Sequence, residues 1–194
     1  MSTQFGLAKY LESSCKQYFV KIAVTGRPGI GKTTLCLKVY EALKDKLNVK
    51  GFVTKEVRDR GVRIGFKLID LSSGEESWLA RVGHKSRFKV GKYGVLVESI
   101  DRFADKIEGY ADADLVILDE IGPMELKSQK FVEAVKKLLN RDDLLFSIHL
   151  KAQHPLLRRI RLEFEVLILT EDNRNRVAEE IVERILHDRK RGKG

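Results

Sequence analysis

One glycine-rich segment, residues 26–33, limits the folds open to this chain more than any other feature. It fits the pattern Gly-x-x-x-x-Gly-Lys-Ser/Thr at every fixed position. Residues 19–25 before it are mostly apolar or β-branched and stop at Gly26, as a buried strand does. After it, apolar residues recur at helical spacing: Leu35, Val39, Ala42, Leu43 and Leu47. A strand, a tight glycine turn and a helix in this order predict an α/β unit.

This segment has the composition of a phosphate-binding loop. Glycines let backbone N–H groups turn inward, and the start of the following helix adds donors and a partial positive charge. Lys32 is then expected to reach the β- and γ-phosphates of a nucleotide, Thr33 to bind Mg²⁺, and Thr34 to contact the α-phosphate. The expected nucleotide-binding residues are Gly26, Arg27, Pro28, Gly29, Ile30, Gly31, Lys32, Thr33 and Thr34.

Two carboxylates follow a fully apolar run later in the chain. Residues 115–118 read Leu-Val-Ile-Leu and lead directly into Asp119 and Glu120. A buried strand here would deliver Asp119 to the carboxyl edge of the sheet, where it can hold Mg²⁺ through a water molecule. Glu120 can orient and deprotonate a water aimed at the γ-phosphorus. The alternative for Glu120 is a helix cap or a structural ion pair.

Apolar runs and amphipathic runs alternate along the rest of the chain. Strands are expected at 49–57, 94–97, 115–118, 144–150 and 165–170, with a β-hairpin over 61–82. Helices are expected at 98–106, 131–139 and 177–186. This alternation predicts one α/β domain over 1–194, with a mainly parallel sheet covered on both faces and a β-hairpin insertion. Residues 1–18 would form an N-terminal extension and 188–194 a basic tail.

Five segments in a fixed order resemble a known family: 26–33, 61–66, 91–95, Asp-Glu-Ile-Gly-Pro-Met-Glu at 119–125, and 173–174. Together they are similar to the small nucleoside-triphosphatase family first described from thermophiles, whose human member is called cancer-related nucleoside-triphosphatase. The match covers about residues 20–187. The resemblance implies a three-layer, RecA-like P-loop NTPase fold. It also implies slow Mg²⁺-dependent hydrolysis of ATP, GTP and other nucleoside triphosphates, with Glu120 as the catalytic carboxylate.

Two further groups of residues are candidates for contacts with the substrate. Hydrolysis needs positive charge on the γ-phosphate in the transition state, and Arg158 and Arg159 are the first choices among several arginines, a solvated polar face being the alternative. Asn173 and Arg174 follow the last predicted strand and can contact the base, although this segment also suits a helix start.

Composition narrows the partners and the location. The 37 basic and 28 acidic residues give a net charge of +9, which favours anionic partners. Two cysteines cannot form a disulfide framework and no run suits a membrane span, so a cytoplasmic protein is expected. The four histidines lack zinc-ligand spacing, so no zinc site is expected.

Two alternatives to hydrolysis stay open at this point. One is a nucleotide or small-molecule kinase, and the other is a nucleotide-regulated protein that binds nucleic acid or a partner. Nucleic-acid binding is disfavoured because aromatic residues make up only 8% of the chain and do not interleave with basic ones as on an RNA-binding sheet. The sequence leaves the oligomeric state open.

Overall fold

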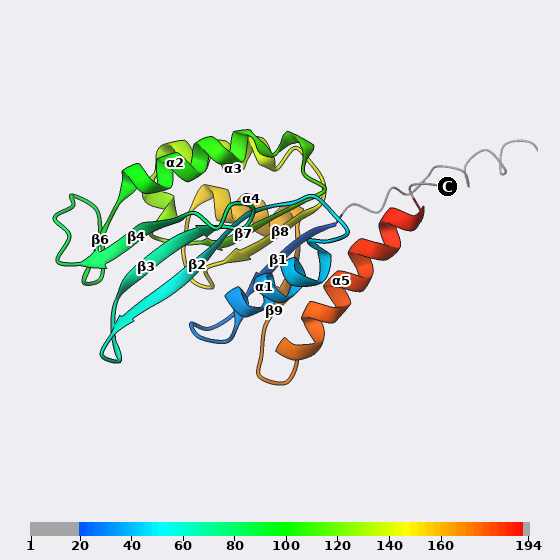
Figure 1. The fold of residues 1–194 in the computed structure, drawn as a ribbon, viewed down its shortest axis with the longest axis horizontal. Coiled ribbons are helices and arrows are strands. Elements are labelled where there is room, and N and C mark those ends of the chain that lie inside the picture. Colours follow the sequence, from blue (N-terminus) through cyan, green and yellow to red (C-terminus); the bar gives the residue numbers. More distant parts are fainter. Residues whose placement is uncertain (1–19, 192–194) are drawn as a thin grey trace, which may run out of the picture.

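A single mixed sheet runs through the whole of the protein, with helices on both faces (Figure 1). The computed structural model describes residues 20–191. Its strands are β1 Lys21–Thr25, β2 Val49–Asp59, β3 Val62–Asp70, β4 Glu76–Val82, β5 Lys89–Val90, β6 Tyr93–Val95, β7 Leu115–Ile121, β8 Leu144–Ile148 and β9 Glu165–Ile168. Its α-helices are α1 Lys32–Leu43, α2 Val97–Glu108, α3 Gln129–Leu138, α4 Pro155–Glu163 and α5 Arg174–Arg191, with short 3₁₀ turns at Tyr110–Asp112 and Glu125–Lys127.

The sheet has a parallel half and an antiparallel half. Its strand order is β5-β6-β4-β3-β2-β7-β8-β1-β9. Strands β2, β7, β8, β1 and β9 run parallel to one another, whereas β3, β4, β6 and β5 continue the sheet antiparallel from β2. Strand β8 lies between β1 and β7, so the strand before the phosphate loop is not adjacent to the strand that carries Asp119.

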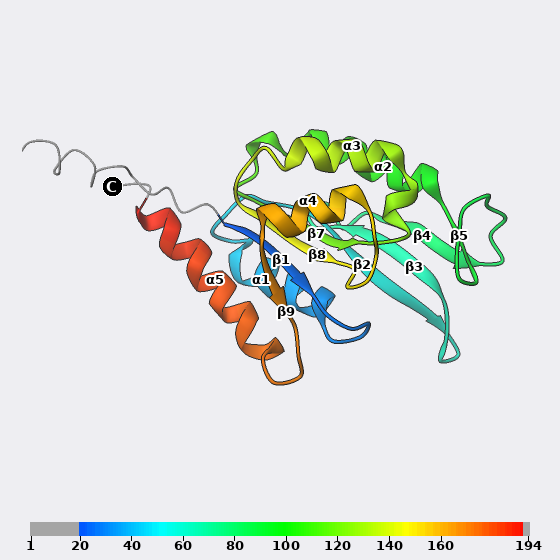
Figure 2. The ribbon, with the colours of Figure 1, turned by 180° about the vertical axis from the view of Figure 1, so that it is seen from behind.

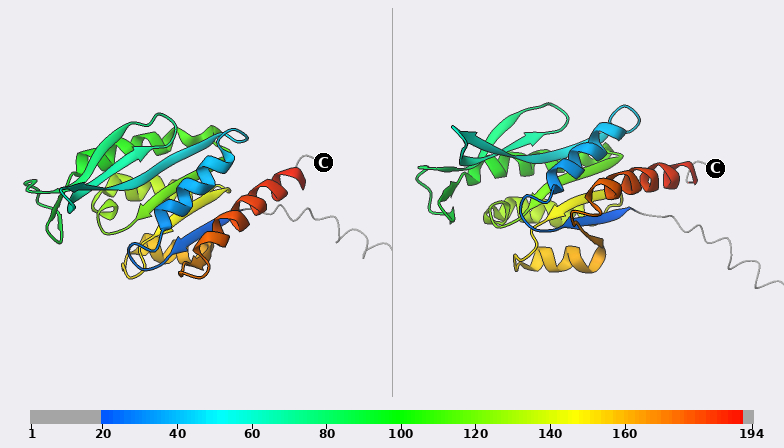
Figure 3. Two further views of the ribbon diagram at one scale, coloured as in Figure 1. Left: turned by 60° about the horizontal axis from the view of Figure 1, so that its bottom comes forward. Right: turned by 90° about the horizontal axis from the view of Figure 1, so that it is seen from below.

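Two apolar cores, one on each face of the sheet, hold the layers together. Helices α1 and α5 cover one face through residues such as Leu35, Val39 and Ile181. Helices α2, α3 and α4 cover the other, where Phe52 packs against Phe103 and Phe131. The two layers are separated by the sheet when the molecule is seen from behind or from below (Figures 2 and 3). This confirms the predicted three-layer α/β architecture.

The predicted strands and helices are present with some shifted bounds, and two elements, β5 and α4, were not predicted. The hairpin over 61–82 is present as β3 and β4, but it extends the main sheet from β2. Residues 155–163 form α4, a helix that the sequence analysis did not predict. Its apolar residues occupy only a short stretch, and Pro155 lies at its first turn. Asp119 and Glu120 lie inside β7 and not after it, because the strand continues to Ile121, beyond its predicted end at 118.

Part of the predicted basic tail belongs to helix α5. Helix α5 continues to Arg191, and Arg189 donates to the Asp114 carboxylate at 2.5 Å and to Asp143 at 3.4 Å. Arg189 therefore fixes the helix to the loops before β7 and β8. The predicted extension 1–18 and Lys193 lie outside the described residues.

The parallel half is built around a close approach between β2 and β7 at Gly51. A Cβ added at Gly51 would lie 1.8 Å from the carbonyl oxygen of Ile117. The Gly51 backbone also has a φ of 137°, a conformation that side chains disfavour. Only glycine lets these two strands pair in the observed register.

We therefore expect Gly51→Ala to lower the free energy of unfolding by about 3 kcal/mol, because the added methyl group must push β2 away from β7. Gly74→Ala is the matched control. Gly74 also has a positive φ, but an added Cβ meets nothing within 4 Å, so about 1 kcal/mol is expected there. Denaturant unfolding of both variants measures the difference, and equal losses would contradict the close-contact explanation.

Candidate active site

The phosphate loop, residues 26–33, connects β1 to α1 at the carboxyl edge of β1. Gly29 and Gly31 have positive φ angles of 78° and 110°, and a Cβ at either position would meet nothing within 4 Å. At Gly26, by contrast, a Cβ would lie 2.9 Å from Ile30 Cγ2 and 3.0 Å from the carbonyl oxygen of Leu169. Gly29 and Gly31 thus face open space, whereas Gly26 is needed because the space beside it is filled.

Helix α1 begins at Lys32 without a side-chain cap. Its N-cap residue is Gly31, and no acidic residue lies in its first turn. Backbone N–H groups at such a helix start lack helical partners and favour a bound anion. The loop and the helix start together suit an anion, and phosphate binding at these residues stays a prediction.

Lys32 is 8% exposed, and its ammonium group lies among oxygen atoms. Its Nζ donates to the carbonyl oxygen of Gly26 at 3.4 Å and lies 3.8 Å from Glu120 Oε2. The structure therefore brings the phosphate-loop lysine and the second carboxylate of the Asp-Glu pair together, although 88 positions separate them in the sequence.

Asp119 is fully buried and joins several elements. Its side chain accepts hydrogen bonds from the Ser147 hydroxyl on β8 and from the Thr54 amide on β2, the latter at 3.3 Å. Burial raises the pKa of Asp119 above its ordinary value, and hydrogen bonds from the Ser147 and Thr33 hydroxyls partly offset this rise. The contact with Thr33 places both predicted magnesium ligands side by side.

Glu120 projects beside Lys32 from the end of β7. The Thr54 hydroxyl donates to the carbonyl oxygen of Asp119 at 2.7 Å and accepts the Glu120 N–H at 3.2 Å, so one side chain fixes both peptide groups. Burial raises the pKa of Glu120 above its ordinary value, and the charge of Lys32 opposes this rise. A raised pKa makes the carboxylate a stronger base.

A third carboxyl group, Glu125, lies buried behind this pair and was not identified as a site residue from the sequence. It is 3% exposed and accepts the Gly122 N–H at 3.0 Å. Burial, together with the nearby Glu120 and Asp119 charges, raises the pKa of Glu125 to about 8. Glu125 is therefore largely protonated at neutral pH.

His149 also belongs to the site, and sequence reasoning missed it because an isolated histidine carries no spacing signal. It follows β8, and its Nδ1 accepts the N–H groups of Lys151 at 3.2 Å and Ala152 at 3.0 Å. Its Cβ and the Cγ of Glu120 both lie about 3.5 Å from the Cβ position of Gly122. Burial and the nearby charges of Lys32 and Arg161 hold its pKa below the ordinary value.

A side-chain contact connects the phosphate loop to the loop before α5. Arg27 forms an exposed ion pair with Glu171 in the loop before α5. The Asn173 side chain donates to the Ile168 carbonyl at 2.9 Å and accepts the Thr170 N–H at 2.8 Å, so it shapes this loop. Arg174 is exposed at the first position of α5. Base contacts by Asn173 and Arg174 stay predictions.

The three arginines of α4 differ in their surroundings. Arg159 pairs with Glu163 at 2.6 Å, and Arg161 donates to backbone carbonyls of the preceding loop, including that of His149 at 3.0 Å. Arg158 is exposed. Because Leu156, Leu157 and Ile160 are buried against the sheet, α4 is a packed helix. A catalytic role for Arg158 or Arg159 stays a prediction.

The donor set suits Mg²⁺ bound together with a nucleotide. Among residues 20–191, no group of three or more His, Cys, Asp or Glu side chains is arranged to hold a metal ion. Mg²⁺ needs no such group, since it commonly takes one or two protein oxygens and completes its shell with phosphate and water. The Asp119 carboxylate and the nearby Thr33 hydroxyl would supply two such oxygens.

Comparisons with known proteins agree with this geometry. A protein family described as NTPase matches residues 21–182. This chain belongs to the NTPase family. A protein of Archaeoglobus fulgidus named nucleoside-triphosphatase THEP1 is 64% identical to this NTPase over 162 residues, which are 84% of this chain and 96% of that protein. A protein of the same name from Methanocaldococcus jannaschii is 43% identical over 171 residues, 86% of this chain and 98% of that one.

Two solved structures share the fold. The crystal structure of THEP1 from Aquifex aeolicus superposes with a TM-score of 0.75 at 33% identity, covering 86% of this chain and 99% of that one. The solution structure of a human cancer-related nucleoside triphosphatase gives 0.71 at 35% identity, covering 86% and 97%. The family resemblance and the P-loop NTPase architecture expected from the sequence are confirmed. No helix within residues 20–191 is long and apolar enough to span a membrane.

The buried Glu125 leads to a prediction about stability. Unfolding returns its pKa from about 8 to the ordinary 4.5, so between these pH values the unfolded chain binds fewer protons and stability falls as pH rises. Glu125→Gln removes this loss, and we expect a melting temperature several degrees above that of the wild type at about pH 8 but not at about pH 5, without nucleotide or Mg²⁺. Exposed Glu133→Gln is the control. A wild-type melting temperature that rises over this range in step with the variant's would contradict the prediction.

Proposed function

We propose that this NTPase-family chain hydrolyses nucleoside 5′-triphosphates to the diphosphate and phosphate in a Mg²⁺-dependent reaction. The observation that carries the proposal is the position of Glu120 Oε2, 3.8 Å from Lys32 Nζ at the phosphate loop. A base and a phosphate-binding cation so close to each other suit attack by water on the terminal phosphate. The name shared by the relatives, nucleoside-triphosphatase, supports the same reaction.

Binding in this proposal depends mainly on the phosphates. The N–H groups at the start of α1 and the Lys32 ammonium hold the β- and γ-phosphates, and Asp119 and Thr33 would hold Mg²⁺. The ion, when bound, neutralises charge on the phosphate oxygens. Because these contacts do not involve the nucleobase, we expect ATP, GTP and other nucleoside triphosphates all to be substrates.

Glu120 acts as the general base. Its carboxylate accepts a proton from a water molecule as the water oxygen bonds to the γ-phosphorus, and the bond between that phosphorus and the β–γ bridging oxygen breaks. The nucleoside diphosphate leaves with the electron pair of that bond. Lys32, already positioned by Gly26, stabilises the negative charge that shifts toward the bridging oxygen.

This assignment predicts different defects for the two residues. Glu120→Gln keeps the size of the side chain but loses the base, so kcat should fall by about 10²- to 10⁴-fold with nucleotide binding retained. Lys32→Ala should lose binding. Phosphate release from the four ribonucleoside triphosphates, with and without Mg²⁺, measures both effects.

Three results would count against this assignment. Unchanged kcat in Glu120→Gln would remove the general base. Phosphate transfer to nucleoside or nucleotide acceptors well above phosphate release would favour a kinase. Unchanged turnover in both Arg158→Ala and Arg159→Ala would remove these arginines from the mechanism.

We further propose that His149 donates a hydrogen bond from Nε2–H to the γ-phosphate. Two backbone N–H groups occupy Nδ1, so the hydrogen-bond network assigns the proton of the neutral ring to Nε2. The electrostatic influence of Lys32 on His149, and the position of both His149 and Glu120 around Gly122, support a place near the terminal phosphate. A donor fixed in this way needs no reorganisation during the reaction.

His149→Asn tests this role, because an asparagine oxygen can still accept the loop N–H groups while Nε2–H is lost. We expect kcat to fall by about a hundred-fold with little change in KM. His154 offers a matched control: its Nδ1 accepts the Leu156 N–H at 3.2 Å in the same way, at the start of α4. His154→Asn should keep normal turnover, and equal kcat values in the two variants would exclude the proposed donor.

A further inference from the structure

The antiparallel end of the sheet carries a run of positive charge that phosphate-loop chemistry does not use. Between positions 81 and 92 the chain has five Lys or Arg residues and no Asp or Glu. We call this run the basic edge. It covers the end of β4, the loop to β5, β5 itself and the turn before β6. Its members, all exposed, are Arg81, Lys85, Arg87, Lys89 and Lys92.

Salt bridges neutralise many other cations of the protein but not these. On the neighbouring strands, Lys55 and Lys67 both pair with Glu76, and Arg63 pairs with Glu56. Within residues 20–191, by contrast, none of the five members of the basic edge forms a salt bridge. The structure thus concentrates uncompensated positive charge at one end of the sheet, which favours an anionic partner.

Aromatic rings accompany these charges. The Arg87 guanidinium lies 4.6 Å from the ring centre of Phe88, Arg81 lies 5.1 Å from that of Trp78, and the Lys92 ammonium lies 5.6 Å from that of Tyr93. This alternation of basic and aromatic residues was not predicted from the sequence. Cations over rings, next to free positive charge, are typical of surfaces that bind both the bases and the phosphates of a nucleic acid.

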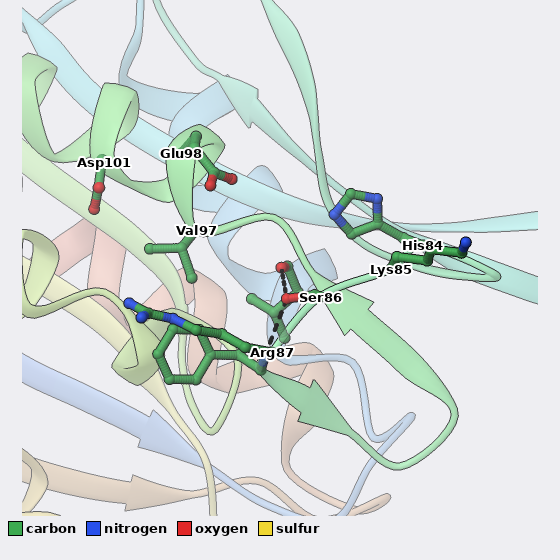
Figure 4. Close-up of a pocket in the computed structure, with 9 residues that line it drawn as sticks. His84, Lys85, Ser86, Arg87, Val97, Glu98 and Asp101 are labelled. Carbon is green, nitrogen blue, oxygen red and sulfur yellow. Dashed lines mark hydrogen bonds between the residues drawn. The ribbon is translucent and has the colours of Figure 1, made fainter.

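A pocket of about 470 Å³ opens between the basic edge and the start of α2. Its size falls within the roughly 300–1,000 Å³ of small-ligand sites. Figure 4 shows Glu98 and Asp101 projecting from α2 on one side, and His84 and Arg87 reaching from the loop on the other. Phe88 also lines the pocket. This site lies at the opposite end of the sheet from the strand that leads into the phosphate loop (Figure 1).

The two walls of the pocket differ in charge: Glu98 and Asp101 line the α2 side, and Lys85 and Arg87 line the loop side. The two carboxylates line the wall formed by α2, where they would repel a phosphate but accept hydrogen bonds from the amino groups of a nucleobase. Asp101 is held in place because it accepts the Ser128 hydroxyl. Lys85 lies in the loop wall of the pocket, and Lys89 and Lys92 lie outside its lining, where they can contact phosphates on either side of an inserted base.

We propose that the basic edge and this pocket bind single-stranded nucleic acid, with one unstacked base in the pocket against Phe88 and the backbone phosphates on Lys85, Lys89 and Lys92. A duplex fits less well, because its bases are paired and stacked. This inference does not depend on the proposed hydrolysis. Lysines at the end of a sheet can also simply prevent edge-to-edge pairing, and that alternative predicts no affinity for nucleic acid.

The test is fluorescence anisotropy of a labelled mixed-sequence DNA strand of about 16 nucleotides with the full chain, over about 50–200 mM salt. The variant Lys85→Gln/Lys89→Gln/Lys92→Gln should weaken binding roughly ten-fold or more at the lowest salt. It should also reduce the slope of log K against log salt by about 2, as expected for three lost phosphate contacts. The matched control Lys38→Gln/Lys46→Gln/Lys127→Gln loses the same charge from exposed positions elsewhere and should bind much as the wild type does.

Two further ligands test the pocket itself. A strand of equal length without bases, and a duplex of the same sequence, should both bind more weakly than the single strand. The proposal would be overturned if the strand without bases or the duplex bound as tightly as the single strand. It would also be overturned if the two lysine variants bound the single strand equally well, or if nothing bound at low salt. Phosphate release from ATP, measured on both triple variants, checks that the fold and the phosphate loop are intact and keeps this result separate from the hydrolysis proposal.

Discussion

The buried carboxylate of Asp119 is the interaction on which the rest of the site depends. A charge without solvent is costly unless hydrogen bonds compensate for it, and here the compensation comes from three other elements: Thr54 on β2, Ser147 on β8 and Thr33 on α1. Each of these contacts requires the strands to be in one register. The need to satisfy one carboxylate therefore fixes β2, β7, β8 and the start of α1 relative to one another.

The charges around the phosphate loop suit a ligand that itself carries both positive and negative charge. Lys32 faces two carboxylates, so the site lacks the surplus of positive charge that a bare anion site would show. The magnesium–triphosphate complex that we propose as the substrate would supply a cation for Asp119 and anions for Lys32 at the same time. In the antiparallel half, by contrast, the cations of the basic edge form no salt bridge within the described residues, and the two halves of the sheet thus differ in the kind of ligand that they favour.

Sequence patterns predict the parts of this structure that depend on neighbours along the chain. The phosphate loop, its flanking strand and helix, and the apolar run before Asp119 are local patterns, and all are present as expected. Contacts between distant residues are not visible in this way: Thr54 and Ser147 are ordinary polar residues until β2 and β8 bring them to Asp119. The same holds for His149, whose role depends on the turn that fixes its ring. Helix α4 escaped prediction because only a few of its residues face the core.

The strand order also dictates when the phosphate loop can form during synthesis. Strand β1 is the first described strand of the chain, yet it pairs only with β8 and β9, the last two, through partners such as Ile22 with Leu145 and with Glu165. Such long-range pairing is slow to form and requires both partners to be present. On the ribosome, residues 20–33 must wait until about 130 further residues have been made and have left the exit tunnel. A truncated product that stops before β8 leaves β1 without either neighbour, so formation of the phosphate loop requires that β8 and β9 have both been made.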